Sequence, residues 1–360
     1  MSMLAKKASG MRKVARKFYN APLTISYNAD MTLIVTLRSY GKTYGFTKEA
    51  IKDYMRDKSQ FVWVRRYGTE LDICKTEIFT DIIAHNEFPG YEFKVDGDKG
   101  YVRKRAKSDK KEDQNPWDVI CHFMSLSQQA NYKGKPFPRV KKIIFDEFIR
   151  VLRTPPGYLR DDVGAFLDLI KTVSRDREGV HAYLLGNACD LVNPYFTFLG
   201  IYKEPREGYT WYKDKHVLVH YAMDEVFADQ ERDTIAGHLV AGTAYEDVMI
   251  NNIFANAGDD FIAKKTKGAK FRYGMEFQGE RFGIWVDLSC GLYFVCRKIP
   301  KDGRMFVLSA QDMRPNLIMI DRVSPFAKSI VRLFQSGCVR FDSPATREAF
   351  LRMLNLCGLR

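Results

Sequence analysis

The 360-residue sequence lacks any run of about eighteen apolar residues, and no apolar segment follows the positive charges near its N-terminus. Neither a membrane-spanning helix nor a secretory signal is therefore expected, and the sequence indicates a cytosolic protein with no membrane partner. None of the seven cysteines forms a C-x-x-C pair, and their number is odd. We expect them to be reduced and buried, because this spacing fits no disulfide framework.

Acidic side chains are absent from the first 17 residues, which contain six lysines and arginines. In residues 251–360, basic side chains outnumber acidic ones by 18 to 10. The net charge of +13 is thus concentrated at the two ends of the chain. Such a distribution favours a polyanionic partner, nucleic acid first, although positive charge can also serve solubility alone.

Strand patterns alternate with helix patterns through the first 205 residues. The expected strands, each apolar and rich in branched residues, are 31–36, 61–65, 119–124, 140–145 and 180–185. Such alternation is typical of an α/β fold with a parallel sheet covered by helices on both faces. We expect this domain to span 1–205, a helical linker to span 206–250, and an α+β domain to span 251–360.

The segment T-L-R-S-Y-G-K-T at 36–43 lacks the leading glycine of the phosphate-binding loop G-x-x-x-x-G-K-[ST] but keeps the end of that motif. It follows an expected strand and opens an expected helix, which is the context in which such a loop binds phosphates. Lys42 would reach the outer phosphates of ATP, and Thr43 would be a ligand of Mg²⁺. The full expected nucleotide-binding set is Thr36, Leu37, Arg38, Ser39, Tyr40, Gly41, Lys42 and Thr43.

Two carboxylates end the strand pattern in V-K-K-I-I-F-D-E-F-I-R, residues 140–150. Asp146 would lie beside the phosphate loop and hold the Mg²⁺ ion, and Glu147 could orient and deprotonate the attacking water. The strand expected at 119–124 falls in sequence between the loop and these acids. The same order occurs in NTPases that insert a strand between the two Walker elements, which are the phosphate loop and the acidic strand end. Paired acids at this position favour ATP hydrolysis over a merely solvated strand end.

An amphipathic helix begins at Asp161 or Asp162, either of which can cap it, and delivers Arg175 and Arg177 to its carboxyl end. An arginine there can be an ordinary cation at a helix terminus, or it can reach the ATP of a neighbouring subunit as an arginine finger. Asn187, at the end of the next expected strand, can sense the γ-phosphate or can be a turn residue.

Three arginines surround the Pro-Pro-Gly turn that follows the paired acids, namely Arg150, Arg153 and Arg160. In a ring, such a loop can face the channel and contact DNA phosphates; otherwise it is a surface turn.

Several ordered segments carry a resemblance to a known family. They include R-S-Y-G-K-T, F-V-W-V-R-R-Y-G-T-E-L, I-I-F-D-E-F-I-R, T-V-S-R-D-R-E-G-V, V-N-P-Y-F and F-G-I-W-V-D-L-S-C-G-L-Y-F. The sequence resembles the DNA-packaging (encapsidation) ATPases of small short-tailed phages with protein-primed genomes, relatives of the FtsK–HerA translocases. The phosphate loop of that family has the form G-x-R-G-x-G-K-S, so Thr36 and Ser39 replace two glycines and imply a somewhat different turn.

The resemblance implies a terminase-like P-loop ATPase of the ASCE class. It would form a homomeric ring, a pentamer in this family, that pushes double-stranded DNA through the portal into a procapsid, with a packaging RNA as a further candidate partner. It would act in the host cytoplasm, at the portal vertex, and be absent from the mature virion. The family roles carried over are the Walker lysine at Lys42, the magnesium aspartate at Asp146, the catalytic glutamate at Glu147 and the trans-acting arginine at Arg175, which leaves Arg177 the less favoured finger.

The resemblance also implies that the second domain is an inactive relative of ribonuclease H-type nucleases that docks nucleic acid. W-V-D-L-S-C-G-L-Y-F-V would be the first hairpin of that fold, with Asp287 at the usual acidic position. A nuclease needs several carboxylates to bind two metals, and no convincing partner acids accompany Asp287. Besides an ATP-driven translocase, two alternatives stay open: a nucleotide-binding and nucleic-acid-binding ring component without turnover, and an ATP-regulated nuclease.

Overall fold

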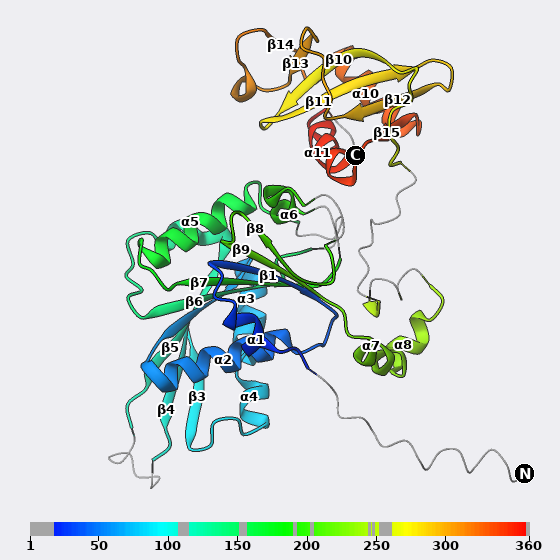
Figure 1. Cartoon of the computed structure of the whole chain (residues 1–360). Coiled ribbons are helices and arrows are strands. Elements are labelled where there is room, and N and C mark those ends of the chain that lie inside the picture. Colours follow the sequence, from blue (N-terminus) through cyan, green and yellow to red (C-terminus); the bar gives the residue numbers. More distant parts are fainter. Residues whose placement is uncertain are drawn as a thin grey trace, which may run out of the picture. The chain divides into compact units, whose positions relative to one another are not determined.

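The computed structural model describes residues 18–106, 115–150, 157–189, 193–201, 205–243, 246, 249–251 and 261–357. The described residues group into two units, the first within Met1–Asp190 and Pro205–Ala255 and the second within Leu191–Glu204 and Asn256–Arg360. Each unit has a sheet and an apolar core of its own (Figure 1). Within these described ranges, no helix has both the length and the apolar character needed to span a membrane.

The first unit is built on a nine-stranded sheet with the order β3-β4-β5-β2-β6-β7-β1-β9-β8. Its strands are β1 Met31–Thr36, β2 Gln60–Arg65, β3 Tyr91–Asp96, β4 Lys99–Lys104, β5 Asp118–Ser125, β6 Val140–Asp146, β7 His181–Gly186, β8 Gly208–Tyr212 and β9 Val217–Ala222. The run from β5 to β9 is parallel throughout. The predicted α/β fold is therefore confirmed, and the five expected strands match β1, β2, β5, β6 and β7 to within one residue.

Helices cover both faces of this sheet, with α5 on one face and α1 and α2 on the other (Figure 1). The helices of this region are α1 Ala21–Ser26, α2 Lys42–Asp57, α3 Gly68–Cys74, α4 Thr80–Ala84 and α5 Asp162–Ser174. Every residue of β1 and of β2 is buried. A strand enclosed on both faces needs a largely apolar sequence. These strands could therefore be recognised although polar and apolar residues do not alternate along them.

The strand between β1 and β6 is β7, whereas β5 lies beyond β2. The strand at 119–124 thus separates the phosphate loop from the paired acids in sequence only, and β7 separates them in space. Because β7 follows the acids in the chain, the order of segments alone could not reveal its position.

The first unit extends past the domain boundary expected at residue 205. β9 pairs with β1 along its full length, and β8 pairs with β9. Residues 206–250 are therefore not a helical linker as a whole, because their first part completes the sheet. Helices follow only afterwards, as α7 Glu225–Arg232 and α8 Ile235–Val240.

The second unit has the α+β character expected of 251–360, but it also includes Leu191–Glu204, which was expected in the first domain. Its sheet has the order β14-β13-β10-β11-β12-β15, and its elements are α6 Pro194–Leu199, β10 Lys270–Phe277, β11 Glu280–Asp287, β12 Leu292–Cys296, β13 Met305–Val307, β14 Leu317–Met319, α10 Pro325–Gln335, β15 Val339–Phe341 and α11 Pro344–Leu356. β10, β11 and β12 pair in antiparallel fashion. The buried faces of the sheet pack with Ile330 of α10 and Phe350 of α11 in one core.

Asp287 lies at the end of β11, so the hairpin expected to be the first of this domain is its second, β11–β12. The first hairpin is β10–β11. The Asp287 carboxylate accepts hydrogen bonds from Thr266 and from the backbone and hydroxyl of Ser289. In the part of the chain that the structure describes, no cluster of three or more His, Cys, Asp or Glu residues could hold a metal ion.

The seven cysteines are free thiols. Cys121, Cys189 and Cys296 are buried, whereas Cys290 is exposed in the β11–β12 turn. The expectation that all seven are buried is therefore wrong, because turn residues lie at the surface whatever their side-chain polarity.

Candidate functional site

The segment 36–43 joins the carboxyl end of β1 to the start of α2, as a phosphate-binding loop should. Thr36 is the last residue of β1, so a glycine is not required there for a left-handed turn. Ser39, with φ 58°, and Gly41, with φ 81°, are left-handed. A serine in this conformation costs about 1 kcal/mol more than a glycine. The replacement that strains the loop is thus the one at Ser39.

Gly41 is required for a second reason, which is the close approach of Phe18. A Cβ atom on Gly41 would lie 3.0 Å from the Phe18 ring. The backbone N–H of Tyr19 donates to the carbonyl of Tyr40 at 2.9 Å. The segment before α1 therefore packs on the phosphate loop, a contact that sequence reasoning missed.

Lys42 is buried, and its ammonium group donates to Asn187 Oδ1 at 2.5 Å and to the Leu37 carbonyl at 3.4 Å. Burial lowers the pKa of Lys42 to about 8, against the opposing effect of the Asp146 charge. A bound polyphosphate would favour the charged form. The structure thus brings Lys42 and Asn187 together, because β1 and β7 are parallel neighbours whose carboxyl ends share one edge.

Asp146 ends β6 at the same edge of the sheet. Its Oδ1 accepts a hydrogen bond from the Thr43 hydroxyl at 3.3 Å, and burial raises the pKa of its carboxyl group while Arg65 and Lys42 oppose the rise. A carboxylate and a hydroxyl oxygen side by side suit Mg²⁺, which prefers oxygen ligands and keeps several waters. Ser39 to Thr43 also line a cavity of about 270 Å³, whose other walls include Glu77, Ile78 and Asp81.

Glu147 follows the strand with φ 59°, and its side chain is 59% exposed. The left-handed backbone turns this carboxylate out of the direction of β6. A buried acid, Asp146, and an exposed acid, Glu147, are therefore adjacent. The buried one is placed to be a metal ligand, and the exposed one is placed to act as a base on water.

Arg65 bridges the two acids. Its Nη2 lies 2.8 Å from Asp146 Oδ2, and its Nη1 lies 2.7 Å from Glu147 Oε2. Its buried Nε has no hydrogen-bond partner among the described residues, so the guanidinium group is held at its two Nη ends. Sequence reasoning gave Arg65 no role. The available signal was its position at the carboxyl end of β2, the strand paired with β6.

Replacing Arg65 with alanine is expected to destabilise the protein by about 3 kcal/mol in the absence of metal, because buried Asp146 loses its counter-charge. Mg²⁺ should restore part of the loss by supplying another cation to the same carboxylate. Thermal unfolding with and without Mg²⁺ measures both effects. Arg56→Ala, which removes a 67% exposed arginine of α2, is the control and should change little. An Arg65→Ala protein that melts like the control would contradict this role.

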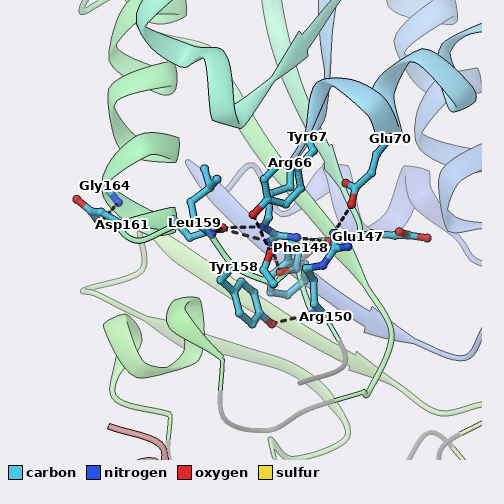
Figure 2. A network of polar contacts seen from close by, with 12 residues as sticks. Arg66, Tyr67, Glu70, Glu147, Phe148, Arg150, Tyr158, Leu159, Asp161 and Gly164 are labelled. Carbon is cyan, nitrogen blue, oxygen red and sulfur yellow. Dashed lines mark hydrogen bonds and ion pairs between the residues drawn. The ribbon is translucent and has the colours of Figure 1, made fainter. Parts of the chain in front are cut away.

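Arg66, the next residue, is buried and hydrogen-bonds to the backbone at and after Glu147 (Figure 2). Its guanidinium group is bidentate to Asp162, at 2.6 and 3.2 Å, and donates to the carbonyls of Glu147 at 3.2 Å and Phe148 at 2.7 Å. The side chains of Arg66 and Asp162 are fully buried. Asp161 is therefore the residue that caps α5, through Gly164, and Asp162 anchors Arg66.

The segment that follows the acids is fixed at both of its described ends (Figure 2). Arg150 Nη1 lies 2.5 Å from Glu70 Oε1, and the Arg150 backbone N–H donates to the Tyr158 hydroxyl at 2.8 Å. Tyr67 donates its hydroxyl hydrogen to the Gly157 carbonyl at 3.1 Å. The Arg150 guanidinium group is thus paired with Glu70 and is not available to contact DNA phosphates. Arg160 is exposed, and Arg153 lies outside the described residues.

Arg175 is not part of the site within one chain. It is the left-handed C-cap of α5 and donates through Nη2 to the Gly134 carbonyl at 2.8 Å. It precedes β7, so it lies near the edge of the sheet opposite to the phosphate loop, about 20 Å away along a six-residue strand. Arg177 donates to the carbonyls of Phe137, Pro138 and Val173, which is a structural role.

Comparisons with known proteins find similar proteins over most of the chain. The family model of the podovirus DNA encapsidation protein (Gp16) matches residues 13–355. The DNA packaging protein of Bacillus phage B103 is 32% identical over 336 residues, covering 91% of this chain and 99% of that protein. The DNA packaging protein of Bacillus phage phi29 is 29% identical over 334 residues, covering 92% and 95%.

Two solved structures are similar over nearly the whole chain. A chain of the bacteriophage Phi-29 viral genome packaging motor assembly superimposes with a TM-score of 0.72 at 28% identity, covering 94% of this chain and 99% of that one. A chain of the Phi-28 gp11 DNA packaging motor has a TM-score of 0.64 at 21% identity, covering 96% and 99%. The second likeness supports the fold alone.

Proposed function

The chain belongs to the family of podovirus DNA encapsidation proteins, and from this membership we propose how its site converts ATP hydrolysis into movement of double-stranded DNA. It is an ATPase of viral genome packaging. The observation that carries the proposal is the convergence of Lys42, Asn187, Thr43 and Asp146 at the carboxyl ends of β1, β7 and β6. No other group of described residues combines a phosphate loop with a metal ligand and a base.

In the proposed site, the backbone N–H groups of the loop and the N-terminus of α2 bind the phosphates. Lys42 places its charge at the outer phosphates, and Asn187 orients the lysine and meets the γ-phosphate. Thr43 and Asp146 would hold Mg²⁺, which supplies charge neutralisation of the phosphates when bound. Glu147 then accepts a proton from the attacking water, for which it must part from Arg65.

The ring arrangement supplies the remaining group. Arg175 is too far from the loop of its own chain, so we propose that it acts on the ATP of a neighbouring subunit. The Phi-29 relative is part of a packaging motor assembly, which supports a role for this chain in a larger assembly. We propose a homomeric pentamer at the portal vertex of a procapsid, acting in the host cytoplasm, with a packaging RNA as a further partner.

Arg153 and Arg160 are the proposed contacts to DNA phosphates. The segment that carries them is connected to the Glu147 backbone through Arg66, Phe148 and Tyr158. Arg153→Ala combined with Arg160→Ala should weaken DNA binding and reduce the slope of affinity against salt by roughly two, since each arginine would neutralise one phosphate. A salt titration of DNA affinity measures this, with Arg56→Ala as the exposed control. An unchanged slope would remove this segment from the DNA path.

Phosphate release by the purified protein, with and without double-stranded DNA, tests the proposed function as a whole. We expect phosphate release that depends on Mg²⁺ and is accelerated by DNA. DNA bound to the segment after Glu147 would change the position of this base. Tight nucleotide binding with no release under any DNA condition would support the alternative of a nucleotide-binding ring component without turnover.

A further inference from the structure

Tyr40, in the middle of the phosphate loop, has its side chain in the core of the first unit. Its neighbours Arg38 and Ser39 are exposed, whereas Tyr40 is buried and belongs to the same core cluster as Tyr19 and Phe227. The proposed mechanism uses the backbone of Tyr40 and gives its side chain no role. Backbone N–H groups bind phosphates without a large buried side chain, so this tyrosine has another purpose in the loop.

Three contacts fix Tyr40 in this position. Its hydroxyl group donates to Asp224 Oδ2 at 2.9 Å, and its ring centre lies 4.9 Å from that of Phe227. Its carbonyl accepts a hydrogen bond from the Tyr19 backbone N–H at 2.9 Å. Because the ring, the hydroxyl group and the backbone are all held, the loop cannot turn at this residue without breaking one of these contacts.

Asp224 is placed for this contact by strand β9. The pairing of β9 with β1 ends at Ala222 and Thr36, so Asp224 follows two residues after the last pair. Asp224 is buried, and its other oxygen, Oδ1, caps α7 by accepting from the Phe227 N–H at 3.0 Å. A hydrogen bond to a carboxylate is stronger than one between neutral groups. The same carboxylate therefore holds the start of α7 and the tyrosine of the phosphate loop.

The backbone on both sides of Tyr40 is left-handed, at Ser39 and at Gly41. Glycine adopts this conformation freely, but serine is disfavoured in it. Without support, a loop with Ser39 would spend more of its time in other conformations, in which its N–H groups do not converge on a phosphate. The contacts of Tyr40 oppose this relaxation at the residue next to the strained one.

We propose that Tyr40 and Asp224 are positioning residues that hold the phosphate loop in its binding conformation and thereby offset the strain at Ser39. The inference rests on the proposed ATP-binding function. It adds that the serine, which replaces a glycine of the family loop, is tolerated because the end of β9 supports the loop from the core.

Tyr40→Phe removes only the hydroxyl group and tests this role. Titration calorimetry with Mg²⁺-ATP and with Mg²⁺-tripolyphosphate should show both ligands bound about tenfold more weakly, because the loop conformation serves the phosphates that the two ligands share. Adding Ser39→Gly to Tyr40→Phe should restore both affinities to within about twofold of those of the unchanged protein. Ser39→Gly alone should change them less than about twofold, because the loop is already held.

Tyr54→Phe is the matched control. Tyr54 of α2 is buried and donates its hydroxyl hydrogen to Asp118 Oδ2 at 2.5 Å, so this variant loses the same kind of bond outside the loop. It should lower the melting temperature as Tyr40→Phe does, yet bind both ligands like the unchanged protein. Asp224→Ser keeps a side chain that can cap α7 but is too short to reach Tyr40. Combined with Tyr40→Phe, it should weaken binding no further than either change alone.

Three results would each overturn the inference. They are unchanged binding by Tyr40→Phe, an equal effect of Ser39→Gly with and without the Tyr40 hydroxyl group, and a loss of ATP affinity that tripolyphosphate does not share. Failure of the unchanged protein to bind either ligand would instead overturn the proposed ATP-binding function itself.

Discussion

Glu147→Gln is expected to bind ATP as the unchanged protein does and to hydrolyse it on the order of 10²–10⁴-fold more slowly. Glutamine keeps the shape of the side chain but cannot accept the proton of the attacking water. Single-turnover hydrolysis and equilibrium nucleotide binding measure the two effects separately. Because the Glu147 side chain is 59% exposed, the substitution should leave the fold intact.

Lys42→Ala is the counterpart that removes binding instead. It deletes the ammonium group that donates to Asn187 beside the loop, so nucleotide affinity should fall first. Burial lowers the pKa of this lysine to about 8, so the affinity of the unchanged protein should also decrease as the pH rises through that value. Hydrolysis by Glu147→Gln at the unchanged rate would show that another group activates the water.

Arg175→Ala subunits should bind ATP but hydrolyse it on the order of 10³-fold more slowly, since the missing charge belongs to the neighbouring site. Mixing them with Glu147→Gln subunits should restore some activity, because at a mixed interface one subunit supplies the arginine and the other the base. Phosphate release across a range of mixing ratios measures the rescue. Arg177→Ala is a poor substitute for this test, since Arg177 supports the local backbone.

Absence of rescue at every ratio, in preparations whose rings are intact, would contradict action between subunits. Activity of Arg175→Ala alone at the unchanged rate would instead leave Arg175 with a structural role at the end of α5, where its side chain donates to the Gly134 carbonyl.

The central strands of the first unit could be predicted because they are buried on both faces. β1 reads M-T-L-I-V-T and β6 reads V-K-K-I-I-F-D. The branched apolar residues in both sequences are typical of a strand in the core of a parallel sheet. The edge strand β8 reads G-Y-T-W-Y, and the turn after it has Lys213, Asp214 and Lys215 all left-handed. That mixture of aromatic and charged residues resembles a connector, which is why the sheet was expected to end before residue 206.

The site itself was only half predictable, for a geometric reason. The loop and the acids are motifs of consecutive residues, so Lys42, Thr43 and Asp146 could be placed from the sequence. Arg65 meets its partners only because β2 pairs with β6, and Asp224 meets Tyr40 only because β9 pairs with β1. Such contacts depend on strand order, which the sequence does not state.

The central claim, that this chain uses ATP to drive DNA into a capsid, is tested most directly by DNase protection. Procapsids with portals, genomic DNA, ATP and the purified protein are combined, and the DNA that becomes resistant to DNase is quantified. We expect protected DNA with the unchanged protein and ATP, and none with Glu147→Gln although that variant still binds ATP. Equal protection by Glu147→Gln, or protection without ATP, would contradict the claim.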